Sequence, residues 1–125
     1  MKAIQVDTWR LGSKILSRML GDRRLSLKPT RQPSHYYRAK KTLFWNLRDG
    51  FDVLLHEAAH IALHHRPSVD RKVRLMRELE AWIWAEEACH LWGLPFNYPL
   101  MDRYFSTYTS HVEGAEKWKI NWRHK

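Results

Sequence analysis

The sequence VLLHEAAHIAL, residues 53–63, decides the fold, because it predicts an apolar helix that carries three ionisable side chains. These are His56, Glu57 and His60, and each costs several kcal/mol if it is buried without a partner. Residues four apart lie on one face of a helix, so both imidazoles can converge on a single ion, with Glu57 close enough to reach a water bound to it. This HExxH spacing is typical of zinc hydrolases, and we expect Zn2+ as the cofactor.

The length and composition predict one soluble domain. The chain has 125 residues, and we expect residues 1–125 to form a single domain that needs no disulfide. Its one cysteine, Cys89, suits a reducing compartment, and we interpret it as a small buried thiol. No apolar run approaches the roughly eighteen residues of a membrane span. We therefore expect a cytoplasmic protein without membrane contact, and its oligomeric state is left open.

The net charge of +9 is concentrated ahead of the motif, in residues 1–50. A basic half predicts weak attraction for nucleic acid or an acidic partner, although a solvated, solubilising face is the commoner explanation. Cations near the first two predicted strands could form one patch, and two aromatics beside them could stack on bases. The cations are Arg23, Arg24, Lys28, Arg31, Arg38, Lys40 and Lys41, and the aromatics are Tyr36 and Phe44.

The residues before the motif predict one helix and two strands. Apolar residues recur at helical spacing from Asp7, a plausible N-cap, to a stop at Gly21. Period-two patterns predict a first strand around Leu25–Leu27 and a longer second strand, Tyr37–Trp45. Lys41 breaks the second pattern, which indicates a bulge or an exposed strand end there.

The residues from the motif onward predict three helices. The motif helix should run from about Phe51 to His65, and a long helix from Asp70 to Trp92 is closed by glycine and proline. A short helix through Thr109 and an edge strand in the tail, Trp118–Trp122, complete the chain. The predicted class is α+β, with a small antiparallel sheet packed on the HExxH helix and a second, ligand-bearing helix.

A third ligand is required, because a catalytic zinc normally takes three protein ligands and keeps one position for water. On the long helix Glu78 and Glu80 point about 200° apart, so only one of them can face the metal. We predict Glu80, which lies among apolar residues, and assign Glu78 and Glu86 to a solvated face. Glu87 is the alternative ligand, or an acceptor that orients a histidine.

The segments LLHEAAHIALHH, residues 54–65, and ELEAWIWAEEA, residues 78–88, resemble the ImmA/IrrE-type metallopeptidases. The resemblance implies a minimal gluzincin, a zincin-like fold in which His56, His60 and Glu80 hold zinc. It also implies that Glu57 is the catalytic acid/base and that His64 is an extra histidine after the motif. A weaker resemblance to SprT-like zinc peptidases would need a third histidine ligand, for which His90 is the well-placed residue.

These observations predict a zinc-dependent metallopeptidase that hydrolyses a protein or peptide substrate. Zinc would activate a water and polarise the carbonyl, while Glu57 takes the proton of the water and delivers it to the leaving amine. Tyr104, Tyr108 or His111 could stabilise the oxyanion. The strand ending at Trp45 could pair its edge with an extended peptide.

The alternative is a non-catalytic, zinc-containing binding or regulatory protein that uses its basic N-terminal face on nucleic acid or an acidic partner. A purely structural zinc site has no need for Glu57, so its presence favours the enzyme.

Overall fold

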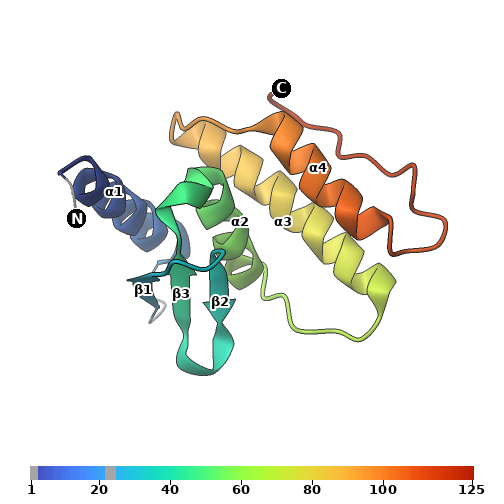
Figure 1. Cartoon of the computed structure of the whole chain (residues 1–125), viewed down its shortest axis with the longest axis horizontal. Helices are drawn as coiled ribbons and strands as arrows, with labels where there is room; N and C mark the ends of the chain where they lie inside the picture. The colour runs from blue at the N-terminus through green and yellow to red at the C-terminus, as the bar shows by residue number, and fades with distance from the viewer. Residues whose placement is uncertain (1–2, 22–24) are drawn as a thin grey trace.

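The computed structural model describes residues 3–21 and 25–125, which form the mixed α+β arrangement that the sequence predicts. In Figure 1 the sheet lies on one side of α2, α3 and α4 lie on the other side, and α1 lies at the end near β1. The elements are α1 (Ala3–Leu20), β1 (Ser26–Pro29), β2 (His35–Tyr37), β3 (Thr42–Trp45), α2 (Gly50–Ala62), α3 (Arg71–Leu91) and α4 (Tyr98–Thr109), with short 3-10 turns at Arg38–Lys40 and Leu47–Asp49.

The sheet is mixed, so the prediction of an antiparallel sheet is wrong. Its strand order is β1-β3-β2, with β1 parallel and β2 antiparallel to the central strand β3. The segment between Pro29 and His35 carries the chain past the end of β3, where the Thr30 N–H donates to the carbonyl of Trp45 at 3.2 Å. A crossover of this kind lets two strands run parallel, and the period-two pattern does not show the direction of pairing.

The predicted long strand Tyr37–Trp45 is two strands. The 3-10 turn and Lys41, which has a left-handed φ of 48°, separate β2 from β3. Leu43 and Trp45 face the core and are fully buried, as their alternation predicts. The break at Lys41 is therefore a complete hairpin turn, where the sequence predicted a bulge or an exposed strand end.

Helix α1 packs on this core through a close approach at Gly12. A Cβ at Gly12 would lie 2.4 Å from Cζ3 of Trp45, which leaves no room for any side chain. The helix starts at Ala3, so the prediction that Asp7 caps it is wrong, but it ends at Leu20 before Gly21, as predicted. Gly21 has a φ of +66°, the left-handed conformation that glycine adopts without strain.

Helices α2 and α3 form an antiparallel pair joined by residues 63–70 (Figure 1). Asp70 caps α3 as predicted, because its carboxylate accepts from the N–H groups of Lys72 and Val73. Helix α2 ends at Ala62 and not at His65, and the side chain of His65 reaches Glu80 of α3. Within the described residues no helix is both long and apolar enough to cross a bilayer.

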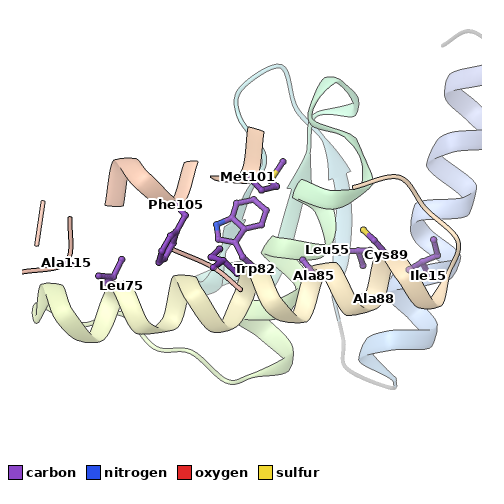
Figure 2. Packing of buried hydrophobic residues seen from close by; sticks show 11 residues of the cluster. Ile15, Leu55, Leu75, Trp82, Ala85, Ala88, Cys89, Met101, Phe105 and Ala115 are labelled. Carbon is purple, nitrogen blue, oxygen red and sulfur yellow. The ribbon is translucent and has the colours of Figure 1, made fainter. Parts of the chain in front are cut away.

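Helices α3 and α4 share one apolar cluster, and Figure 2 shows Trp82 of α3 pointing toward Met101 and Phe105 of α4. Cys89 is buried near α1, as predicted, and burial raises the pKa of its thiol to about 12. The tail after α4 is not the predicted edge strand. Trp122 instead packs against α4 and donates from Nε1 to Asp102 at 2.8 Å.

Candidate metal centre

Two histidines from α2 and one glutamate from α3 converge at the centre of the helix pair. Nε2 of His56 lies 2.9 Å from Oε2 of Glu78, and Nε2 of His60 lies 3.2 Å from Oε1 of the same carboxylate. The three ligand atoms lie within 4.8 Å of one another, so this group could hold a metal ion. The one-turn spacing of the histidines therefore places both imidazoles on one face, as the sequence predicts.

Glu80, the predicted third ligand, does not face the histidine pair. Its side chain is 54% exposed, and Oε2 lies 3.4 Å from Nε2 of His65. Glu78, which the sequence analysis assigned to a solvated face, occupies the position beside His56 and His60. The two glutamates point to different sides of α3, and the phase of the helix selects Glu78.

The signal that could have identified Glu78 is the buried stripe of α3. Leu75, Trp82, Ala85 and Cys89 are all buried and lie seven, three and four residues apart, on one face of the helix. Glu78 falls in the gap of this stripe between Leu75 and Trp82. Glu80 shares its face with Met76, which is 41% exposed, so that face points to solvent.

The two alternative ligands, Glu87 and His90, lie with the C-terminal tail. Glu87 pairs with Arg123 and His124, and the ring of His90 stacks on His124 at a centroid distance of 3.7 Å. Neither side chain lies in the group around His56, so neither alternative ligand is brought to it.

Glu86 is buried, which corrects its assignment to a solvated face. Its carboxylate accepts from the hydroxyl of Tyr98 at 2.8 Å and from the backbone N–H groups of Arg123 and His124 at 2.9 and 3.0 Å. These three hydrogen bonds satisfy the buried charge and hold the tail against α3 and α4. Glu86 therefore has a structural role, because it anchors the C-terminal tail.

Glu57 and Glu78 have opposite pKa shifts. Burial raises the pKa of Glu57 to about 7. Burial would also raise the pKa of Glu78, but its hydrogen bonds to His56 and His60 and their positive charge outweigh this effect and lower it to about 2. Burial lowers the pKa of His56, whose ring stacks on Trp82 at 3.7 Å. Glu78 is thus ready to bind a cation, and Glu57 is poised to exchange a proton near neutral pH.

A chain of side chains behind His60 fixes the orientation of its ring. Nδ1 of His60 lies 2.9 Å from Nδ1 of His65, and Nε2 of His65 lies 3.4 Å from Glu80. A carboxylate is an acceptor, so His65 donates from Nε2 and accepts at Nδ1. His60 then donates from Nδ1, and its Nε2, which donates to Glu78, would present a lone pair to a metal once its proton is lost. Glu80 and His65 therefore act through His60.

One cavity of about 970 Å³ opens over the group. It is lined by His56, Glu57, His60 and Glu78, and His64, the predicted extra histidine, also lies in its wall. Two of the three proposed oxyanion donors, Tyr108 and His111, belong to its lining. Burial raises the pKa of Tyr108 to about 12, so its hydroxyl stays protonated and can donate.

The third proposed donor, Tyr104, lies outside this cavity. It lines a smaller one of about 330 Å³ that shares His56, Glu57 and Tyr108 with the first. The predicted peptide edge also differs, because β3 is paired on both sides, and β1 and β2 are the two edge strands.

The described residues of the predicted nucleic-acid patch lie in different environments. Arg23 and Arg24 lie outside the described residues. Arg38 and Lys41 line the large cavity, and the ring of Phe44 stacks on a neighbouring histidine at 5.0 Å. Nucleic-acid binding by this half of the chain stays a prediction.

Comparison with known proteins identified no relative of this chain. No protein-family model, curated protein or solved structure matches the chain.

Proposed function

We propose that the protein is a zinc-dependent metallopeptidase that hydrolyses peptide bonds. The observation that carries the proposal is the convergence of His56, His60 and Glu78, with Glu57 beside them in the same cavity. Two imidazoles and one carboxylate form a donor set that catalytic zinc sites use. The histidine nitrogens lie 2.9 and 3.2 Å from the two oxygens of the Glu78 carboxylate, and the three ligand atoms lie within 4.8 Å of one another, a spacing that suits one ion bound by all three residues.

The element order supports a zincin-like fold and agrees with the ImmA/IrrE-type resemblance. A helix and a small sheet precede the HExxH helix, and a second helix supplies the acidic ligand. The ligand position departs from the resemblance, because Glu78 replaces Glu80. The departure keeps the number and type of the ligands, so the expected chemistry is unchanged.

The side chains of the site have separate tasks in amide hydrolysis. Bound zinc supplies a Lewis acid that activates water and polarises the substrate carbonyl. Glu57, with a pKa of about 7, takes a proton from the attacking water and gives it to the departing amine nitrogen. The protonated hydroxyl of Tyr108 can donate to the developing oxyanion, and the contact with His65 holds the ring of His60.

Metal analysis and a matched activity assay test the proposal. We expect one zinc per chain in the purified protein and its loss in His60→Ala. Glu57→Gln should retain zinc and lower hydrolysis of a panel of unfolded proteins by at least roughly 10², the scale of general acid/base assistance. Absence of zinc from the wild type would exclude the proposed centre. Full activity in Glu57→Gln would exclude the role of Glu57.

A further inference from the structure

The wall of the large cavity is strongly cationic. Six of its lining residues are arginine or lysine, and the two acidic ones are Glu57 and Glu78. Both acids belong to the candidate metal centre, so neither is available to neutralise the rim. The six cations are Arg38, Lys41, Arg66, Arg71, Arg74 and Arg77.

The described part of the chain supplies no ion pair that would neutralise these cations. In residues 3–21 and 25–125, none of the six forms an ion pair with a carboxylate within 4.0 Å. Arg77 donates to the backbone carbonyl of Arg66, a contact that orders the rim and leaves its charge uncompensated. A cavity lined by one sign of charge attracts molecules of the opposite sign.

The first turn of α3 adds a second observation. Arg71, Lys72 and Arg74 all lie in the first four residues of this helix, and the turn contains no acidic residue. The N-terminus of a helix carries partial positive charge, so cations there oppose the helix dipole. The Asp70 carboxylate at this end caps the backbone N–H groups of Lys72 and Val73 and forms no ion pair with Arg71 or Arg74 in the described residues, so an anionic ligand there would be favourable.

The cations come from two separate parts of the chain. Arg38 and Lys41 belong to the turn between β2 and β3, while the other four belong to the α2–α3 loop and α3. Both segments lie at the lower edge of the molecule in Figure 1, and the metal-ligand group shares the cavity with both. A chain that crosses the centre therefore meets positive charge from the sheet and from the helices.

We infer that this cavity selects acidic polypeptide segments, with side chains of Asp or Glu held by the arginines of the rim. The inference rests on the proposed function and names its substrate class. Arginine binds carboxylates with paired, charge-assisted hydrogen bonds. A polypeptide fits better than a nucleic acid, because enzymes that cleave phosphodiesters commonly use two metal ions, and the described residues provide one group of metal ligands.

A binding experiment tests the substrate class independently of catalysis. The probes are a short fluorescein-labelled peptide that alternates Glu and Ser, its Lys–Ser counterpart, and a short single-stranded DNA. Anisotropy is measured at about 0.15 M salt, where exposed charges are screened beyond about 8 Å. The full-length wild type is kept metal-free with a chelator, so that no hydrolysis takes place.

Two matched double variants remove the same charge, one from the rim of the cavity and the other from the C-terminal tail. Arg71→Gln with Arg74→Gln should weaken binding of the Glu–Ser peptide roughly tenfold, through loss of charge-assisted hydrogen bonds. Lys117→Gln with Lys119→Gln, both exposed in the tail outside the cavity, should change it less than about twofold. Both pairs are solvent-exposed, and circular dichroism confirms that the variants fold.

Each outcome decides the inference. The inference is supported if the wild type prefers the Glu–Ser peptide and only the Arg71 and Arg74 variant loses this preference. Equal binding of both peptides, or equal effects of the two variants, overturns it, and tighter DNA binding lost with the same arginines assigns the rim to nucleic acid. If the acidic peptide binds but metal analysis of protein purified without chelator finds no zinc, the ligand class stands and the proposed function fails.

Discussion

Replacing Glu78 or Glu80 with glutamine tests which of the two glutamates binds the proposed zinc. The structure places Glu78 in the candidate metal centre, whereas the sequence predicts Glu80. Glutamine keeps the size of glutamate, so neither change opens a cavity. Glu78 contacts both His56 and His60, whereas Glu80 is 54% exposed and reaches only His65. We expect Glu78→Gln to remove most of the stabilisation by zinc and Glu80→Gln to leave most of it.

The magnitude follows from linkage between binding and folding. At a free zinc concentration of 100 times the wild-type Kd, zinc stabilises the fold by about 2.7 kcal/mol. If loss of the Glu78 ligand weakens binding by about 100-fold, the same zinc stabilises the variant by only about 0.4 kcal/mol. For a domain of this size the difference corresponds to roughly 10 °C in Tm.

The pH dependence of stability in the metal-free protein provides a second test of Glu78. The pKa of Glu78 falls from an ordinary 4.5 to about 2 in the folded state. A depressed carboxylate pKa stabilises the fold above pH 4.5, and this contribution is lost as the pH falls from 4.5 toward 2. It amounts to at most about 3 kcal/mol, and Glu78→Gln should flatten this part of the stability curve.

The assay is thermal unfolding followed by circular dichroism, with buffered zinc and with chelator, for the wild type and both variants. The reasoning fails if Glu80→Gln abolishes the zinc-dependent rise in Tm while Glu78→Gln retains it. That result would restore the position predicted from the sequence.

Three further changes test other contacts of the site and the core. His65→Ala should weaken zinc binding about 10- to 100-fold by removing the acceptor that orients His60, as isothermal titration would show; unchanged affinity would exclude the orienting role. Gly12→Ala should lower the free energy of unfolding by about 1–2 kcal/mol, because the cost of the overlap between its Cβ and Trp45 exceeds the gain in helix propensity. Urea unfolding measures this change, and a more stable variant would contradict the packing. Tyr108→Phe should lower kcat with little change in zinc content if its hydroxyl donates to the oxyanion. An unchanged kcat would exclude Tyr108 as the oxyanion donor.

The helices were largely predictable from the sequence, because their signals are local. The cap at Asp70 and the glycine stop at Gly21 depend on residues within one turn, and both lie where they were predicted. Errors arose where a distant element decides. The tail alternates apolar and polar residues over Trp118–Trp122, but its apolar side chains pack against α3 and α4 instead of pairing as a strand.

The sheet shows the same limit of local patterns. Alternation identifies Leu43 and Trp45 as the buried face of β3, and both are fully buried. The pattern is the same whether a neighbouring strand runs parallel or antiparallel, since side chains alternate in either case. The path of the chain from Pro29 to His35 determines the direction, and that path is a tertiary property.

At the site, the HExxH spacing was sufficient for the histidine pair, because both residues lie on one helix. The third ligand depends on how α3 is rotated against α2. The apolar neighbours of Glu80 favour that residue, whereas the buried stripe through Leu75 and Trp82 favours Glu78. A polar residue within a buried stripe is the more informative signal, because burial requires it to have a partner.

The division of roles between Glu57 and Glu78 follows from their partners rather than from their burial. Their side chains are similarly enclosed, 20% and 15% exposed, so desolvation raises the pKa of both. Glu78 accepts hydrogen bonds from two imidazoles, which favour its charged form, while the nearest imidazole nitrogen to Glu57 in an ion pair is 3.9 Å away. One carboxylate is therefore held as an anion suited to a metal, and the other keeps a pKa of about 7 suited to proton transfer. Two glutamates of identical chemistry can thus divide into ligand and base because only one of them faces both histidines.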